Sequence, residues 1–316
     1  MKNKLKTGAI LTTTAVGLLH VLNKCISAVS TLKDLLPSSD GRYFTWRFGK
    51  VYYEKTGTGS PLLLIHDLSP YASSYEWSLL RQKLSKTHTV YTLDLLGCGR
   101  SDKPNMTYTN YLYVQLISDF IEKVITEKTD VVVTGLSSSF VVMACGNNPD
   151  LFNKLLMINP ENLVELASIP GKRSKMTKFL MDMPIIGTTL YHILSSRDNI
   201  EYLFTEKYFY NPFRVKSKQI QVYYESAHKG DSCGKYLLSS INGNYVNINI
   251  SNALKNINNS IFVLLGTHYE NAKLIADSYT KMNPAIETVF LDDTKFLPQL
   301  EAPELTCSNI TLFLES

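Results

Sequence analysis

The sequence predicts an α/β protein built on a mainly parallel β-sheet. From Tyr43 onward, short apolar runs alternate with longer segments that have the 3.6-residue period of helices, and this alternation is typical of the α/β class. The alternation stops between residues 162 and 259 and then resumes. We therefore expect one α/β core that carries a helical insertion.

The first half of the core follows from the order of these runs. Residues 43–48 and 50–55 read as an opening hairpin, and residues 61–65 form a continuous apolar run, as expected of a strand covered on both faces. The later expected strands are 88–95, 131–134 and 155–158, and the expected helices are 73–84, 111–125 and 138–147.

The interruption predicts a helical cap, because its helical patches at 175–181, 187–194 and 220–227 are separated by Pro170, Pro184 and Pro212. After it we expect strands at 261–265 and 286–291 and helices at 271–282 and 303–314. The predicted organisation is an N-terminal apolar helix at 1–38, a core formed by 39–161 and 260–316, and a cap at 162–259.

Composition narrows the function classes. The chain has 316 residues, 44% of them hydrophobic, so it can bury a full core, and its 32 basic and 28 acidic residues form no basic stripe of the kind nucleic-acid binders carry. The five cysteines are scattered, which predicts free thiols and no disulfide framework or zinc site. We expect no metal or other cofactor, because no metal-ligand cluster or phosphate-binding glycine loop is present.

The N-terminal segment has features of a signal peptide or membrane anchor. Lys2, Lys4 and Lys6 precede an uncharged stretch at residues 7–23, but threonines and His20 interrupt it and no A-x-A cleavage site follows. Its length lies at the lower limit for spanning a bilayer. An anchor, an amphipathic helix on a membrane and a helix packed on the protein remain open, so we expect a cytoplasmic or membrane-associated protein.

The strongest chemical motif follows the apolar run at 131–134. Gly135-Leu136-Ser137-Ser138-Ser139 places small residues two positions before and two after Ser137, as a nucleophile elbow requires. Ser137 is therefore the candidate nucleophile. The alternative interpretation is a structural helix cap, because serine caps helices well.

Three further segments, together with this motif, resemble those of a known family. Residues 61–67 (PLLLIHD), 93–104 (LDLLGCGRSDKP) and 297–304 (LPQLEAPE) resemble segments of the α/β-hydrolase superfamily, particularly its capped branch of epoxide-hydrolase-like and haloalkane-dehalogenase-like proteins. The resemblance covers about Tyr43 to Leu314. It implies a mainly parallel eight-stranded sheet flanked by helices, with a helical cap inserted after strand 6. The helix after the elbow is a residue or two shorter than the family pattern.

The resemblance also implies an oxyanion hole and a catalytic base. The backbone N–H groups of Leu68 and Ser138 would form the hole, although Asp67 replaces the family's glycine at that turn, and a carboxylate there is unfavourable for an oxyanion. The family's catalytic histidine corresponds to Phe296, which cannot accept a proton. His66 corresponds to a histidine that shapes the loop.

The acid position is also altered. Tyr269 stands where the family has aspartate, so Glu270, one position later, and Glu161, at the alternative acid position, are the candidate acids. For both residues the alternative of a surface carboxylate is favoured over a catalytic role. His268 lies at the carboxyl end of the sheet and is the candidate replacement base.

Three functions remain open. The first is a serine hydrolase of esterase type that acts on a small acyl substrate, with activity weakened by Phe296. The second is an inactive hydrolase-fold protein that binds an apolar small molecule under the cap. The third is a scaffold tethered to a membrane by its N-terminal helix.

Overall fold

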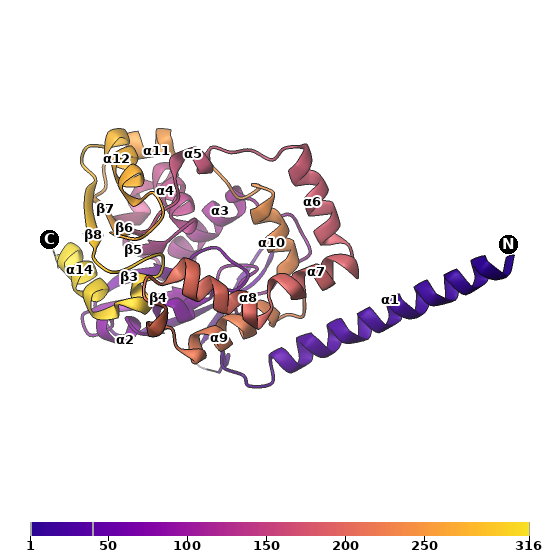
Figure 1. Cartoon of the computed structure of the whole chain (residues 1–316). Helices are drawn as coiled ribbons and strands as arrows, with labels where there is room; N and C mark the ends of the chain where they lie inside the picture. The colour runs from indigo at the N-terminus through magenta and orange to yellow at the C-terminus, as the bar shows by residue number, and fades with distance from the viewer. Residues whose placement is uncertain (1, 40, 316) are drawn as a thin grey trace.

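A computed structural model of the chain describes residues 2–39 and 41–315, with the side chains of residues 2–13, 15 and 16 outside the description. Eight strands form one sheet in the order β1-β2-β4-β3-β5-β6-β7-β8. The pairs β1–β2 and β2–β4 are antiparallel, and every other neighbouring pair is parallel. This architecture confirms the predicted fold class (Figure 1).

The strands lie close to the predicted runs. The central strands β3, β5 and β7 are buried along almost their whole length, because helices cover both faces of the sheet. The strands are β1 (Arg42–Trp46), β2 (Gly49–Thr56), β3 (Ser60–Ile65), β4 (His88–Leu93), β5 (Thr129–Thr134), β6 (Phe152–Ile158), β7 (Ile261–Gly266) and β8 (Glu287–Leu291).

Alternate side chains of the strands enter two separate cores. Leu63 and Val133 point into the larger core, which α3 (Asn110–Phe120), α4 (Ser137–Asn147) and α12 (Ala272–Met282) cover. Leu62 and Val132 point into the smaller core, which η1 (Ser74–Trp77), α2 (Arg81–Leu84) and α14 (Pro303–Glu315) cover.

Two predicted helices are interrupted. The helix expected at 73–84 is a 3₁₀ turn, η1, followed by the short α2, and the helix expected at 111–125 ends in a π-helical turn, η2 (Ile121–Ile125). A buried contact explains the first difference, because the backbone N–H of Ser74 donates to Asp94 Oδ1 at 2.7 Å and fixes the start of η1. A short helix, α13 (Pro298–Glu301), precedes α14.

The segment between β6 and β7 is helical, with no strand among its residues. Its elements are α5 (Leu163–Leu166), α6 (Lys172–Asp182), α7 (Ile186–Leu194), α8 (Arg197–Tyr202), η4 (Leu203–Tyr208), η5 (Pro212–Arg214), α9 (Ser217–His228), α10 (Gly234–Asn242) and α11 (Ser251–Asn256). Phe204, Phe209 and Tyr223 from this segment pack with Tyr71 and Leu297 of the rest of the chain. The segment is therefore held against the sheet by its own apolar cluster.

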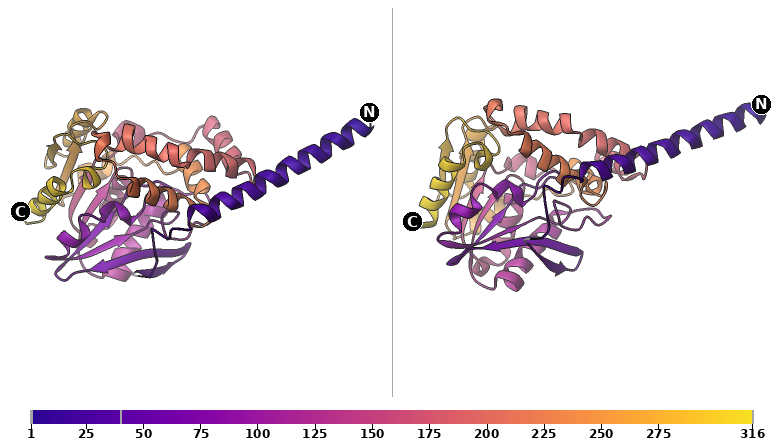
Figure 2. Two further views of the ribbon diagram at one scale, coloured as in Figure 1. Left: turned by 60° about the horizontal axis from the view of Figure 1, so that its bottom comes forward. Right: turned by 90° about the horizontal axis from the view of Figure 1, so that it is seen from below.

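Helix α1 (Lys2–Ser30) extends away from the body, and the C-terminal part of its described residues contacts α7 and α9 (Figures 1 and 2). The apolar stretch predicted at residues 7–23 is helical, although most of its side chains lie outside the described ones. Within the described part of the chain, no helix combines the length and the hydropathy that a membrane span requires.

Candidate functional site

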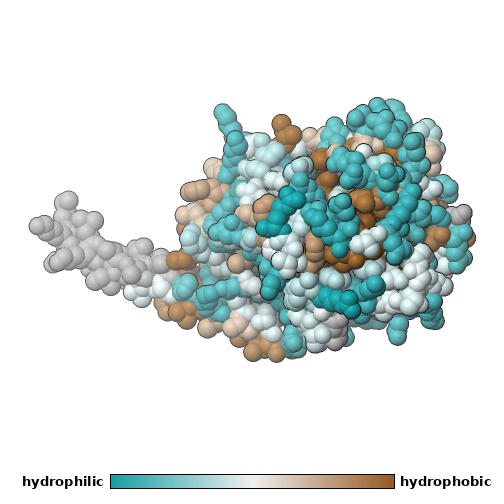
Figure 3. Space-filling view, turned by 180° about the vertical axis from the view of Figure 1, so that it is seen from behind, coloured by the Kyte–Doolittle hydropathy of each residue, from teal (hydrophilic) through white to brown (hydrophobic). Residues whose placement is uncertain are grey.

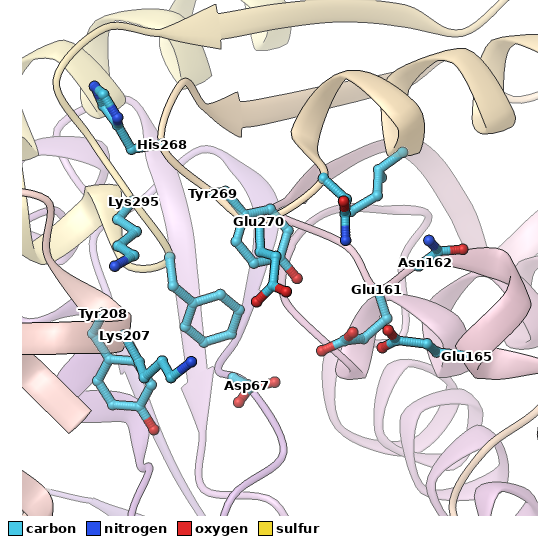
Figure 4. Close-up of a pocket in the computed structure, with 13 residues that line it drawn as sticks. Asp67, Glu161, Asn162, Glu165, Lys207, Tyr208, His268, Tyr269, Glu270 and Lys295 are labelled. Carbon is cyan, nitrogen blue, oxygen red and sulfur yellow. The ribbon is translucent and has the colours of Figure 1, made fainter. Parts of the chain in front are cut away.

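A pocket of about 610 Å³ opens where the carboxyl ends of β3, β6, β7 and β8 meet η4, the position at which open α/β sheets bind ligands. Figure 4 shows the side chains that converge on it from these loops. The lining residues are Asp67, Glu161, Asn162, Glu165, Lys207, Tyr208, His268, Tyr269, Glu270, Asn271, Ile275, Lys295 and Phe296.

The turn after β5 places Gly135, and not Ser137, directly at the end of the strand. The strand ends at Thr134, and Gly135 follows it directly with a left-handed φ of +59°. In a nucleophile elbow the reactive residue occupies this strained position between strand and helix. Ser137 instead lies in the first turn of α4, is 0% exposed, does not line the pocket, and its Oγ makes no hydrogen bond to the described residues.

The two backbone N–H groups expected to form an oxyanion hole, those of Leu68 and Ser138, have different partners. The backbone N–H of Leu68 donates to the Asp67 carboxylate, as does the N–H of Leu136, the residue after Gly135, at 3.0 Å from Oδ1. Ser138 does not contribute, because its N–H donates to the carbonyl of Gly135 at 3.1 Å within the turn. The Asp67 carboxylate thus accepts backbone N–H groups from the turns after β3 and β5.

Glu76 supplies a second buried carboxyl group beside Asp67. Burial raises the pKa of Asp67 to about 6, although the N–H groups of Leu136 and Leu68 oppose the rise. Glu76 of η1 is fully buried, accepts from Gln299 Nε2 at 2.7 Å and from the Asp67 N–H at 3.3 Å, and burial and the Asp67 charge raise its pKa to about 8. Sequence analysis missed Glu76, because nothing around it marks a site.

Phe296 lines the pocket, at the family's histidine position. Its ring packs between Tyr208 and Tyr269, with ring centroids 5.5 Å and 5.6 Å away. A Cβ added at Gly135 would overlap the Asp67 carboxylate and lie 2.9 Å from the Phe296 ring. Asp67 and Phe296 together fill the space that a nucleophile side chain at position 135 would need.

The remaining candidate residues line the pocket but form no relay with Ser137. The His268 ring stacks on Tyr210 with a centroid distance of 3.6 Å, and it lies at one end of the pocket, far from Asp67 (Figure 4). Glu270 and Glu161 face the pocket from the loops after β7 and β6. Their carboxylates and the buried Ser137 are not brought together.

The pocket lining is mixed in polarity, with charged side chains beside aromatic ones. Burial, reinforced by the neighbouring carboxylates of Asp67, Glu165 and Glu270, raises the pKa of Glu161 to about 8. Figure 4 shows the Glu161 and Glu165 carboxylates side by side, with the Lys207 ammonium directed toward Asp67. Among the described residues, no group of three or more His, Cys, Asp or Glu side chains is arranged to hold a metal ion.

His66 has the structural role that was expected of it. Its Nε2 accepts from the Leu95 N–H at 3.0 Å, and its Nδ1 contacts the carbonyl of Asp67 at 2.6 Å. Burial lowers the pKa of this fully buried imidazole. His66 therefore ties the loop after β3 to the end of β4 and holds the turn that carries Asp67.

One observation in the sequence bears on the register of the elbow. The helix after the motif is a residue or two shorter than the family pattern, and moving the nucleophile position from Ser137 to Gly135 removes this discrepancy. Val133-Thr134-Gly135-Leu136-Ser137 then corresponds to the five-residue elbow.

Comparisons with known proteins agree with this architecture. A family described as "Alpha/beta hydrolase family" matches residues 62–214. An uncharacterized protein of Mycobacterium tuberculosis is 26% identical over 166 residues, which are 49% of this chain and 48% of that protein, so the chain spans about half the length of this curated relative.

Two solved structures match over much more of the chain. A serine hydrolase involved in carbazole degradation has a TM-score of 0.72 at 16% identity and covers 87% of this chain and 98% of its own. A carboxylesterase of Bacillus subtilis has a TM-score of 0.68 at 17% identity and covers 94% of this chain and 98% of its own. At these identities the likeness establishes a shared fold.

Proposed function

We propose that this chain, which belongs to the α/β-hydrolase superfamily, is a catalytically inactive member that binds a small polar molecule in the pocket of Figure 4. One observation carries the proposal: the Asp67 carboxylate accepts the N–H groups of Leu68 and Leu136. A tetrahedral oxyanion would need the same two donors, so a negatively charged side chain competes with the transition state for them.

The other positions needed for acyl transfer support the same proposal. Gly135 at the elbow has no nucleophilic atom, and Phe296 at the base position cannot take a proton. Tyr269 lies at the position of the acid. Because these groups act as a unit, losing even one typically costs a factor of ~10³ or more in rate, and here all of them differ.

The pocket lining favours a ligand that carries a cationic group. Four carboxylates, from Asp67, Glu161, Glu165 and Glu270, face the pocket together with two lysines. One of these, Lys295, already donates to the backbone carbonyl of Glu206. Since like charges and burial raise the pKa of Glu161, a bound cation would replace its proton and relieve the repulsion. Tyr208, Tyr269 and Phe296 supply an aromatic wall for the rest of the ligand.

Fluorophosphonate labelling tests the loss of catalysis without a known substrate. The purified protein and its Ser137→Ala variant are treated with the probe, and adducts are located by intact mass and peptide mapping. Neither is expected to label, because the hydroxyl of Ser137 is buried and has no base. Labelling of the unaltered protein at Ser137 that the variant lacks would establish a serine hydrolase and overturn the proposal.

Thermal denaturation with matched small organic cations and anions tests binding. A ligand at about a hundred times its Kd stabilises the folded state by about 2.7 kcal/mol. We expect cations to raise the Tm and the matched anions to leave it unchanged. In a Glu161→Gln variant the cations should raise the Tm by less than in the unaltered protein. Stabilisation by anions alone would contradict the proposed charge preference.

A further inference from the structure

Two helices of this protein, α1 and α7, turn polar side chains inward and aliphatic side chains outward, the reverse of the usual arrangement on a globular protein. The described buried residues of α1 are Asn23, Ser27 and Ser30. Asn23 Nδ2 donates to Thr189 Oγ1 at 3.2 Å, and Ser30 Oγ donates to the Tyr224 hydroxyl at 2.8 Å. The helix is therefore docked on α7 and α9 through hydrogen bonds.

The opposite side of α1 is apolar. Leu18, Val21, Leu22 and Val29 recur at helical spacing and are all exposed, Leu18 at 61% and Val29 at 65%. Because the docking contacts use the polar side, nothing in the described chain covers these side chains. A helix that exposes its apolar stripe in this way has a face available for a partner.

Helix α7 repeats the inversion. Its buried side carries Thr188, which accepts from Lys235 Nζ at 3.1 Å, and Tyr191, whose hydroxyl donates to the carbonyl of Ala227 at 2.6 Å. Its exposed side carries only aliphatic side chains at i, i+4, i+7 and i+8: Ile186, Leu190, Ile193 and Leu194. In the neighbouring α6, Met176, Phe179 and Leu180 share one exposed side.

These side chains lie on neighbouring helices, because α7 contacts both α1 and α6. We call them together the apolar face and define it by the exposed apolar residues of these helices: Leu18, Val21, Leu22, Val29, Met176, Phe179, Leu180, Ile186, Leu190, Ile193 and Leu194. Figure 1 shows the three helices on the side of the molecule opposite α12 and α14, and Figure 3 shows apolar surface beside the base of α1. Single exposed apolar residues are ordinary, but a contiguous patch marks an interaction site.

The charges around the apolar face identify its partner. No acidic residue occurs before Asp34, and α7 has no charged residue other than its histidine. Helix α6 carries Lys172, Arg173, Lys175 and Lys178 against one acidic residue, Asp182, which pairs with Lys178 at 2.6 Å. An apolar surface with a basic rim suits a bilayer that contains anionic lipid.

We propose that the apolar face rests on an anionic membrane surface, with α1, α6 and α7 lying at the headgroup level and no segment crossing the bilayer. A second copy of the chain suits the face less well. A symmetric dimer through this face would bring the basic rims of two copies together, and like charges at an interface oppose association.

Vesicle co-sedimentation of the full chain tests this proposal. We expect the protein to pellet with vesicles of equimolar phosphatidylglycerol and phosphatidylcholine, and to pellet much less with phosphatidylcholine alone. A Phe179→Glu/Ile193→Glu variant should lose binding by about tenfold or more, because both side chains are highly exposed and would enter the interface. A Lys172→Glu/Arg173→Glu variant should lose the preference for anionic vesicles.

The matched control is Leu274→Glu on α12, an exposed leucine on the opposite side of the molecule, which should bind as the unaltered protein does. Circular dichroism and the Tm establish that each variant is folded. The proposal fails if the unaltered protein stays in solution with both vesicles, or if Leu274→Glu loses binding as much as the apolar-face variant. It also fails if light scattering shows a dimer that Ile193→Glu dissociates, because the second copy is then the occupant.

Discussion

The turn after β4 and the turn after β5 lie at the same edge of the sheet, and each resembles a family motif, but they differ in what they retain. After β4, Asp94 is fully buried and accepts from the N–H of Arg100 and from its Nε, both at 2.8 Å. Gly97 and Gly99 adopt the left-handed φ values that this tight turn needs. The Asp94 carboxylate and the Arg100 guanidinium of this turn are therefore hydrogen-bonded to each other.

The turn after β5 also contains a glycine with a left-handed φ, but its surroundings differ. Gly135 keeps the left-handed conformation of an elbow, while Asp67 and Phe296 fill the space beside it. The first turn is stabilised by a buried ion pair, whereas the second has a carboxylate and an aromatic ring in the space beside its glycine.

The largest effect is expected at Asp94. Burial alone would raise its pKa, but the charge and hydrogen bonds of Arg100 hold the pKa of this carboxyl well below its usual range. Asp94→Ala leaves the buried Arg100 guanidinium without this partner and should cost about 3–5 kcal/mol, measured by urea denaturation. A loss below about 1 kcal/mol would show that this turn does not stabilise the fold.

The next largest effect is expected at Gly135. An alanine there must adopt a left-handed conformation, which costs about 1–2 kcal/mol, and its Cβ also overlaps the Asp67 carboxylate. Gly135→Ala should therefore destabilise by about 2–3 kcal/mol in urea. The double variant with Asp67→Gly should recover part of this loss, a coupling of about 0.5–3 kcal/mol.

Gly171→Ala is the control for this pair, since no atom lies within 4 Å of a Cβ at Gly171 and its φ is −100°. It should change stability by no more than about 1 kcal/mol. Purely additive effects of Asp67→Gly and Gly135→Ala would contradict the inferred contact between the two positions.

A smaller effect concerns Glu76 and pH. Because the folded-state pKa of Glu76 is raised to about 8, the native chain holds a proton that the unfolded chain releases near its model value of 4.5. Stability from this group is present below the unfolded pKa and is lost as pH rises through the folded pKa. Glu76→Gln should remove a loss on the order of 1–3 kcal/mol between about pH 5 and pH 8.

Urea midpoints at both pH values measure this slope. Glu122→Gln, at an exposed carboxylate of η2, serves as the control and should leave the slope unchanged. If Glu76→Gln and the unaltered protein show parallel pH profiles, Glu76 is ionised in the folded chain at neutral pH.

The smallest effect is expected at Ser137. Its buried Oγ has no hydrogen-bond partner among the described residues, so Ser137→Ala removes a desolvated hydroxyl and no bond. Stability should change by less than about 1 kcal/mol in either direction. Ser139→Ala is the matched comparison, because the Ser139 Oγ donates to the Leu136 carbonyl at 2.8 Å and its loss should cost about 1 kcal/mol. A larger loss at Ser137 than at Ser139 would indicate a role that this geometry does not explain.

Much of the fold could be predicted because it follows from local sequence patterns. The continuous apolar runs of β3, β5 and β7 and the period of α12 and α14 follow from burial and need no knowledge of distant contacts. The short helices α8 and α10 of the insertion were missed, because such segments are stabilised by packing more than by their own pattern. The candidate site was predicted in part: Asp67, Glu161, His268, Glu270 and Phe296 all line the pocket.

The strand pattern of the sequence predicted the fold class, and the family resemblance implied that Phe296, Tyr269 and Asp67 stand at the positions of a histidine, an aspartate and a glycine, because patterns and motifs are local properties. The left-handed conformation of Gly135, the burial of Ser137 and the hydrogen bond from the Leu136 N–H to Asp67 became apparent only in the tertiary structure. The same holds for the outward apolar sides of α1 and α7. These features depend on contacts between loops that are distant in the sequence. Residue spacing along the chain does not determine such contacts.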